Sequence, residues 1–196
     1  MLEHVSAQFP CGRMTAVLGK SGSGKTTMFQ VLLKQHPYSG TIKIDGLDLR
    51  RIKEKTLFSK MGTVFQNPGN QFISQNVLEE VASSLRLWKK PETDATELLE
   101  CYGLWQYRKY SPYMLSQGQQ RRLAVLSVLC GGQHILLLDE PTYGQDPAST
   151  EAIMKQLRLK IEQEQLTVVM ITHDEDLAKN WADRCYRLAD RRLYEA

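Results

Sequence analysis

The run GKSGSGKT at residues 19–26 constrains the fold more than any other stretch of the chain. It matches the pattern G-x-x-x-x-G-K-[ST], follows the apolar run MTAVL and leads into a run with helical spacing. A strand that turns tightly into a helix directs backbone N–H groups and the positive end of the helix dipole at one spot. We therefore expect a phosphate-binding loop made of Gly19, Lys20, Ser21, Gly22, Ser23, Gly24, Lys25, Thr26 and Thr27.

Two acidic residues end a strand later in the chain. Ile135–Leu138 is a continuous apolar run, and Asp139 and Glu140 follow it directly. Because α/β folds bind ligands at the carboxyl edge of the sheet, we expect these acids to face the loop. Lys25 is then suited to contact the β- and γ-phosphates, Thr26 and Asp139 to hold Mg²⁺, and Glu140 to orient an attacking water.

Short apolar runs alternate with longer amphipathic ones, which favours an α/β fold with a mainly parallel sheet. The runs typical of strands are 13–18, 41–44, 63–65, 135–138 and 168–171, and those typical of helices are 25–33, 77–87, 93–102, 117–129 and 149–164. Only helical patterns occur between residues 77 and 129. We expect one domain, 1–196, with a core at approximately 1–72 and 130–196 and a helical subdomain at approximately 73–129.

Composition narrows the class of protein. The net charge of +3, from 25 basic and 22 acidic residues, gives no reason to expect a nucleic-acid partner. The scattered basic pairs, Arg121/Arg122 among them, are expected to lie on solvated faces. Four widely spaced cysteines favour reduced thiols in the cytosol. The sequence has no signal-peptide pattern and no run long enough to span a membrane, so membrane contact would require another protein.

A second anion-binding pattern, LSQGQQRR, occupies residues 115–122. Ser116 and the N–H groups around Gly118 would begin the helix at 117–129, where the helix dipole and its free donors favour an anion. The simpler alternative is that Ser116 caps the helix, and both roles are compatible. The question is why one chain would need two such sites.

These patterns resemble the nucleotide-binding domain of ABC (ATP-binding cassette) ATPases over nearly the whole chain. The matching segments are residues 19–26 (Walker A), Gln66 in VFQNP (Q-loop), 115–119 (signature), 135–140 (Walker B), 143–146 (D-loop) and His173 in MITHD (switch histidine). The resemblance implies a P-loop NTPase fold with a mainly parallel RecA-like sheet, a small antiparallel β portion and a helical (signature) subdomain inserted after the Q-loop.

The resemblance also implies the cofactors ATP and Mg²⁺ and a head-to-tail pair with a second ABC ATPase subunit. Each signature then closes over the ATP held by the other chain, which explains the second anion site. Glu140, His173 and Gln66 would be catalytic, and Gln66 would also meet Mg²⁺. The signature would contribute Ser116, Gln117, Gly118 and Gln119, and Asp146 would link the two sites. Gln117 stands where the family usually has glycine, so we expect the signature to bind the nucleotide in an altered way but not to lose this role.

The stretch FQNPGNQF, followed by VLEEVASSL, resembles the ATPase subunits of energy-coupling-factor importers. That resemblance implies integral membrane transporter subunits as partners and a cytoplasmic, peripheral position on the inner face of the cell membrane. One set of apolar residues either lines the groove for such a subunit or packs the helical subdomain: Phe72, Val77, Leu78, Val81 and Leu85. Another ABC transporter class, a soluble non-transport ABC ATPase and a non-hydrolysing module remain alternatives, as do homodimer and heterodimer.

Two departures from the family pattern concern the ends of the chain. Family members usually begin with a further strand whose aromatic residue stacks on adenine, but here the phosphate loop starts at Gly19. Phe9 is the only aromatic residue before it, and we expect it to be too close for that task. Near the C-terminus, Asp190-Arg191-Arg192 forms the last turn without the glycine that a tight hairpin favours.

Overall fold

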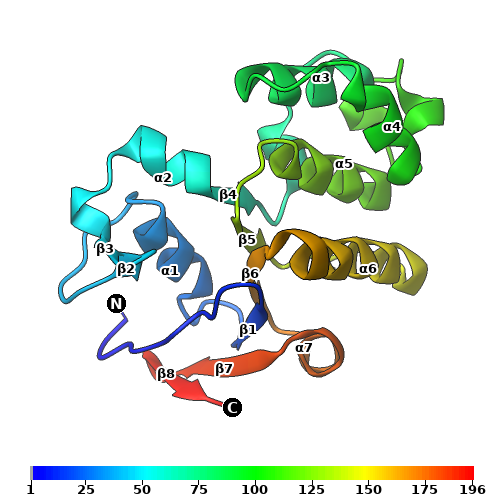
Figure 1. The fold of residues 1–196 in the computed structure, drawn as a ribbon. Helices are drawn as coiled ribbons and strands as arrows, with labels where there is room; N and C mark the ends of the chain where they lie inside the picture. Colours follow the sequence, from blue (N-terminus) through cyan, green and yellow to red (C-terminus); the bar gives the residue numbers. More distant parts are fainter. Residues whose placement is uncertain (1) are drawn as a thin grey trace.

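The computed structural model describes residues 2–196 (Figure 1). A six-stranded sheet has the order β4-β5-β6-β1-β7-β8. Its strands are β1 (Met14–Leu18), β4 (Met61–Val64), β5 (Ile135–Asp139), β6 (Thr167–Thr172), β7 (Arg184–Ala189) and β8 (Arg192–Glu195). All neighbours are parallel except β7 and β8. A separate antiparallel pair is formed by β2 (Lys43–Ile44) and β3 (Leu47–Asp48), so the expected mixture of sheets is confirmed.

The helices follow the expected order. They are α1 (Lys25–Leu32), α2 (Glu54–Lys60), α3 (Val77–Leu87), α4 (Asp94–Cys101), α5 (Gln117–Leu129), α6 (Pro147–Glu164) and α7 (Glu175–Trp181). Short 3-10 helices occur at Leu49–Arg51, Pro68–Gln71, Trp105–Tyr107 and Pro112–Met114. The sequence patterns missed α2 and α7, and they placed the start of α6 two residues late. Pro147 fits the first turn because the N–H it lacks would have no helical acceptor there.

Side chains of the central strands alternate between two hydrophobic clusters, one on each face of the sheet. On β1, Ala16 and Leu18 face one cluster while Val17 faces the other. The cluster that contains Val17 packs against α1, α2 and the small sheet; the other packs against α3 to α7. Figure 1 shows this arrangement, with α1 and α2 on one side of the sheet and α6 and α7 on the other. Burial on both faces explains why the strands read as continuous apolar runs.

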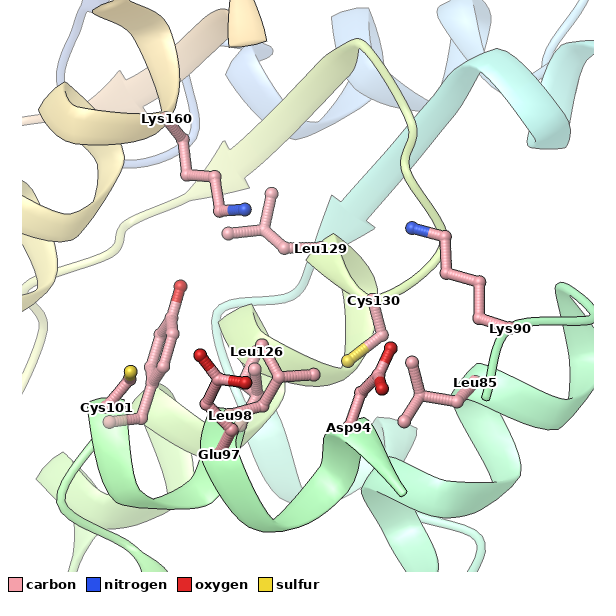
Figure 2. A pocket seen from close by; sticks show the side chains of 11 residues that line it. Leu85, Lys90, Asp94, Glu97, Leu98, Cys101, Leu126, Leu129, Cys130 and Lys160 are labelled. Atoms are coloured by element: carbon pink, nitrogen blue, oxygen red, sulfur yellow. The ribbon is translucent and has the colours of Figure 1, made fainter. Parts of the chain in front are cut away.

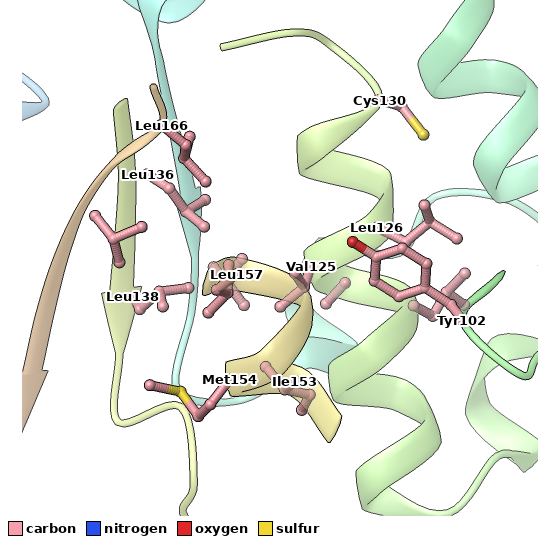
Figure 3. Packing of buried hydrophobic residues seen from close by; sticks show 14 of the residues in the cluster. Tyr102, Val125, Leu126, Cys130, Leu136, Leu138, Ile153, Met154, Leu157 and Leu166 are labelled. Atoms are coloured by element: carbon pink, nitrogen blue, oxygen red, sulfur yellow. The ribbon is translucent and has the colours of Figure 1, made fainter. Parts of the chain in front are cut away.

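The helical subdomain is joined to the sheet through α6. Ile153, Met154 and Leu157 of α6 lie between the sheet residues and Val125 and Leu126 of α5 (Figure 3). Of the residues considered for a membrane-subunit groove, those buried in the same cluster are Phe72, Val77, Val81 and Leu85, with Leu78 partly buried against them. The structure therefore supports the simpler alternative: these residues pack the subdomain.

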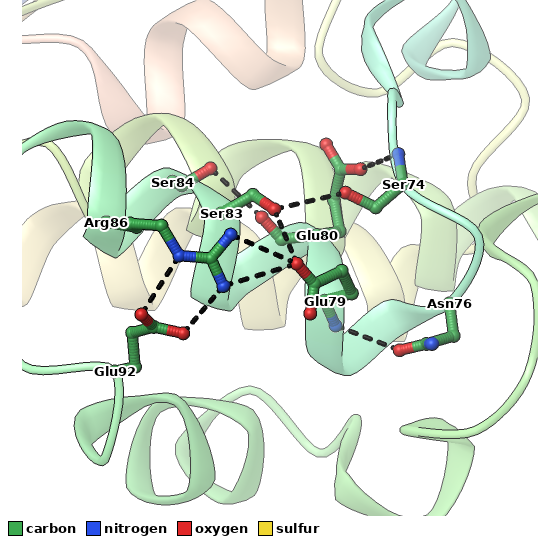
Figure 4. Close-up of polar contacts among 8 residues, drawn as sticks. All are labelled: Ser74, Asn76, Glu79, Glu80, Ser83, Ser84, Arg86 and Glu92. Atoms are coloured by element: carbon green, nitrogen blue, oxygen red, sulfur yellow. Dashed lines mark hydrogen bonds and ion pairs between the residues drawn. The ribbon is translucent and has the colours of Figure 1, made fainter.

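Polar contacts fix the segment before α3 (Figure 4). Asn76 caps the helix by accepting a hydrogen bond from the N–H of Glu79. The buried carboxylate of Glu80 accepts bonds from the N–H groups of Ile73 (3.0 Å) and Ser74 (2.8 Å). The segment is thereby held in one conformation with the Ile73 side chain 86% exposed.

The last hairpin forms without glycine. Asp190 (φ 46°) and Arg191 (φ 64°) both adopt the left-handed conformation that a two-residue turn of this kind requires. The carbonyl of Arg191 accepts a hydrogen bond from Glu3 N–H, which ties the first described residues to the hairpin. Nearby, the ring of Phe9 packs edge-on against Tyr186, with the ring centroids 6.0 Å apart.

Candidate active site

The expected site residues meet at the carboxyl edge of three neighbouring strands. Because β5, β6 and β1 are adjacent and parallel, the loops that follow them lie side by side. The phosphate loop follows β1, Asp139 and Glu140 end β5, and His173 follows β6. Residues more than 100 positions apart in the chain, such as Thr26 and Asp139, are thereby in contact.

The phosphate loop has the backbone that an anion site needs. Gly22 (φ 78°) and Gly24 (φ 103°) are left-handed, and Gly24 precedes the first turn of α1. The Lys25 side chain is 7% exposed, and its ammonium donates to the carbonyls of Gly19 (2.6 Å) and Lys20 (3.2 Å). Within residues 2–196 the buried Ser23 hydroxyl has no hydrogen-bond partner. These donors at the start of a helix fit a phosphate group.

Thr26 and Asp139 form the pair of oxygens expected for Mg²⁺. The Thr26 hydroxyl donates to Asp139 Oδ2 at 3.2 Å. Burial raises the pKa of Asp139, and the bond from Thr26 opposes that effect. A hydroxyl and a carboxylate suit Mg²⁺, which takes its other oxygens from phosphates and water.

Glu140 connects the loop lysine to the histidine. Its Oε1 lies 3.4 Å from Lys25 Nζ, and its Oε2 lies 2.9 Å from His173 Nδ1. The Thr172 hydroxyl also donates to Oε2, at 3.2 Å. The Glu140 side chain is 10% exposed, whereas that of His173 is 60% exposed. The carboxylate is thus held in place while the imidazole remains open to a ligand.

Arg121 is the site residue that the sequence did not reveal. It is 1% exposed, so the expectation that both arginines of this pair are solvated was wrong for it. Its Nη1 donates to the carbonyl of Phe65 (2.6 Å), and its Nη2 donates to those of Gln66 and Glu140 (3.4 Å). Burial lowers the pKa of Arg121 to about 10, so it remains charged at neutral pH.

A helical signal for that burial was present in the sequence. Arg121 shares the i, i+3, i+4 spacing with Ala124 and Val125, both of which are fully buried. Its neighbour Arg122 points elsewhere and donates to the carbonyl of Tyr102. The arginine pair therefore divides between two faces of α5.

Ser116 is the N-cap of α5, as the simpler reading of that residue predicted. Its hydroxyl accepts from Gln119 N–H (3.3 Å), and its own N–H donates to Gln119 Oε1 (2.9 Å). Asp146 has the same role for α6, because its carboxylate accepts from Ser149 N–H at 3.0 Å; hydrogen bonding from the side chain and then the backbone of Ser149 lowers the pKa of Asp146. Within residues 2–196, no hydrogen bond joins the 115–119 segment to the phosphate loop at 19–27.

The signature turn instead packs against residues 144–149 of its own chain. A Cβ at Gly118 would lie 2.8 Å from Ser149 Oγ, and one at Gly144 would lie 2.4 Å from Gln117 Oε1. Gly118 therefore leaves room for the Ser149 side chain, whereas Gly144 has a left-handed φ of 69°, which favours glycine. Gln117, the departure from the family pattern, fits against a glycine that leaves room for it.

Gln66 lies beside a polar hollow of about 330 Å³ between the Q-loop, α5 and the D-loop. Its side chain is exposed, and only its carbonyl is held by the rest of the site. A second hollow of about 250 Å³ lies among α3, α4, α5 and α6 (Figure 2). None of the expected site residues lines this second hollow, so it is separate from the site.

A protein-family model described as "ABC transporter" matches residues 2–143. The chain belongs to this family. It is 39% identical over 183 residues to the putative HMP/thiamine import ATP-binding protein YkoD of Bacillus subtilis, which covers 93% of this chain and 33% of that protein. It is 36% identical over 197 residues to the energy-coupling factor transporter ATP-binding protein EcfA1 of Mycoplasma mobile, with 98% and 72% covered. The chain thus spans about a third of the length of the B. subtilis relative.

Solved structures agree with this membership. The ATP-binding cassette MJ0796, in a dimeric post-hydrolysis state bound to ADP and Pi, superposes with a TM-score of 0.87 at 29% identity, covering 100% of this chain and 89% of that one. CbiO1 from Clostridium perfringens, part of the ABC transporter complex cbiONQ, gives 0.86 at 32% identity, covering 98% and 79%. The protein is therefore an ABC ATPase with a P-loop NTPase fold. No helix within residues 2–196 is both long and apolar enough to cross a membrane.

Proposed function

We propose that this ABC ATPase binds Mg-ATP at residues 19–27, hydrolyses it between two subunits and powers import through integral membrane subunits. The observation that most supports this function is that Lys25, Glu140 and His173 lie together, beside the contact between Thr26 and Asp139. That arrangement supplies a cation for phosphate, a carboxylate for water and an imidazole within one cluster.

Each residue has a distinct task in this scheme. Lys25 exchanges its carbonyl contacts for the β- and γ-phosphates, and Thr26 and Asp139 hold Mg²⁺, which would neutralise phosphate charge when bound. Glu140, released from Lys25, accepts a hydrogen bond from the attacking water and orients it for in-line attack. His173, held through Nδ1, contacts the γ-phosphate.

The second subunit completes the site. Ser116 and the N–H groups at the start of α5 form an anion-binding end that is not bonded to the chain's own phosphate loop. In a head-to-tail pair, this end meets the γ-phosphate held by the partner. ATP bound between two chains then stabilises the pair by mass action. The dimeric state named for MJ0796 supports this assembly.

Import is supported by the names of the relatives, which include a putative thiamine import protein and an energy-coupling factor subunit. The exposed side chains of Ile73, Tyr113 and Met114 form an apolar surface, hereafter the docking surface, on the helical subdomain. The Tyr113 hydroxyl donates to the carbonyl of Phe72 at 3.2 Å, so its two segments lie together. We propose that a membrane subunit binds there and holds the ATPase at the inner face of the membrane.

The dimer is tested with the Glu140→Gln variant, which should bind ATP and not hydrolyse it. Light scattering after gel filtration should show a dimer with Mg-ATP and a monomer without it. Adding Ser116→Arg should abolish the dimer but leave ATP binding intact, whereas Thr96→Arg, at an exposed position on α4, should not. Loss of ATP binding in the Ser116→Arg protein would contradict a site shared between chains.

The docking surface is tested by replacing Ile73 with Asp. A charge there should prevent co-purification with membrane subunits, because burying it without a partner is costly. Leu87→Asp is the matched control, since Leu87 is 74% exposed at the C-terminal end of α3, whereas Ile73 precedes the start of that helix. Equal retention of membrane subunits by both variants would place the contact elsewhere. ATP hydrolysis by the isolated variants should match that of the wild type.

A further inference from the structure

Arg121 joins three carbonyl groups that belong to two different parts of the site. Phe65 and Gln66 follow β4, whereas Glu140 follows β5. The two strands are parallel neighbours, and the guanidinium lies across their carboxyl ends. Among the described residues, no carboxylate side chain lies within ion-pair distance of Arg121, so the direct contacts of the buried guanidinium are to backbone carbonyls, while the charges of Asp139 and Glu140 favour its protonated form from further away.

The contact to Glu140 falls on a strained residue. Glu140 has φ 47°, a left-handed conformation that non-glycine residues adopt only where other contacts hold them. Its N–H donates to the carbonyl of Ile171 at 2.9 Å, and its carbonyl accepts from Arg121. Both backbone polar groups of Glu140 are therefore held, and its carboxylate lies beside Lys25 and His173.

A planar guanidinium is suited to this task, and an ammonium is not. Its two terminal nitrogens diverge at a fixed angle and reach carbonyls on both strands at once. Lysine at the same position would keep the charge but would lose the fixed fork. A lysine substitution therefore tests whether the planar shape of the arginine side chain, and not only its positive charge, is required.

The same side chain ties these carbonyls to the signature helix. Ser116 begins α5 and Arg121 lies five residues later, about 8 Å along the helix axis. A rigid helix transmits a shift at its first turn to the guanidinium with little loss. When Ser116 contacts the partner's nucleotide, a shift of α5 would therefore also move the backbone of Gln66 and Glu140 in the same chain.

We propose that Arg121 is a positioning residue for hydrolysis. It sets the distance between the backbones of Gln66 and Glu140, and it couples that distance to the position of α5, the helix that begins at the signature. This inference rests on the proposed function, since it assigns a route by which each nucleotide site senses the other. Arg121 itself touches backbone, not substrate. The polar hollow beside it, lined also by Gln120 and Gln145, leaves space for the guanidinium to shift.

The first test compares Arg121→Lys and Arg121→Gln with Arg122→Lys, the neighbouring substitution that alters a carbonyl contact inside the helical subdomain only. Thermal unfolding verifies that each variant is folded. Both Arg121 variants should lower kcat at least about tenfold while KM for ATP stays within about twofold, because binding groups are intact and positioning is lost. Arg122→Lys should leave both values near wild type. Equal kcat in all variants, or a loss confined to KM, would overturn the inference.

A second test measures the structure directly. Hydrogen exchange of peptides that contain residues 65–71 and 140–146 should be faster in Arg121→Lys than in wild type and unchanged in Arg122→Lys. This readout needs no ATP hydrolysis. An inactive wild-type protein would contradict the proposed function, whereas unchanged exchange in Arg121→Lys would contradict the role of Arg121.

A third test locates the defect within the dimer. Arg121→Lys should damage the site that holds its own chain's nucleotide, and Ser116→Arg should damage the partner's. Mixing the two proteins should therefore give more activity than the sum of the two measured alone, because each mixed dimer contains one intact site, formed by the phosphate loop of the Ser116→Arg chain and the signature of the Arg121→Lys chain. No recovery would mean that Arg121 acts on the signature of its own chain and not on Glu140.

Discussion

At the scale of single residues, the site depends on backbone conformation as much as on side chains. The sequence predicts Asp139 and Glu140 at a strand end, because an apolar run that stops in two acids has few other interpretations beside a phosphate loop. It does not predict that Glu140 is left-handed or that Arg121 binds its carbonyl. Those features depend on contacts between segments up to 56 residues apart, which no local pattern encodes.

Lys25 is the residue whose loss should be most damaging. Lys25→Ala removes the buried ammonium that contacts the loop carbonyls and lies beside Glu140. We expect hydrolysis to fall by about 100-fold or more, because the charge on the transferred phosphoryl group is no longer balanced. Phosphate release under saturating Mg-ATP measures this.

Lys55→Ala is the control for that substitution, since Lys55 is an exposed lysine on α2. It should hydrolyse ATP at the wild-type rate. A Lys25→Ala protein with wild-type turnover would disprove the assignment of the phosphate loop.

At the scale of helices and strands, hydrophobic periodicity located the long elements well because burial sets their spacing. The 117–129 helix and the 77–87 helix have the expected bounds. Short elements such as α2 and α7 gave no comparable signal, because they make only two turns and bury one or two residues. The sequence also did not predict which faces of the helices and strands pack against each other. The contact between β4 and α5 is one example: a Cβ at Gly62 would lie 2.2 Å from Val128 Cγ1.

Gly62→Ala should therefore push α5 away from β4. We expect a loss of about 1 to 3 kcal/mol in unfolding free energy, as for other overpacked cores. Denaturant unfolding measures it, and the double variant with Val128→Ala should recover much of the loss because the added methyl then has space. If the two substitutions were additive, these groups would not be in contact.

At the scale of the whole molecule, one hydrophobic cluster runs from the sheet through α6 into the helical subdomain, so the two parts should unfold together. The same cluster contains Cys130 at the end of α5, where burial raises the pKa of the thiol from 9 to about 11. The folded state holds that proton more tightly than the unfolded chain does. The stability contributed by the neutral thiol is thus complete below pH 9 and is lost as the pH rises to about 11.

Unfolding free energy should accordingly fall by about 3 kcal/mol over that range, beyond any loss from other groups. Burial also raises the pKa of Tyr102, which adds loss in the same direction at higher pH. Denaturant titrations between pH 8 and pH 11 measure the slope. Cys130→Ala should reduce it, and Cys11→Ala, at an exposed cysteine, should not. Equal slopes in all three proteins would show that Cys130 is not the titrating group.

The position of β1 in the middle of the sheet has a consequence for how the protein is made. Residue 14 lies opposite residue 168 on one side, and residue 15 lies opposite residue 184 on the other. A ribosome that has just released β1 must add about 150 more residues before either neighbouring strand exists. Until then an apolar strand and the loop after it have no sheet to join, and both of its edges can pair with other chains. Strand β1 is therefore synthesised early relative to its neighbours and completes its pairing late, so its edges are exposed for most of the synthesis of this domain.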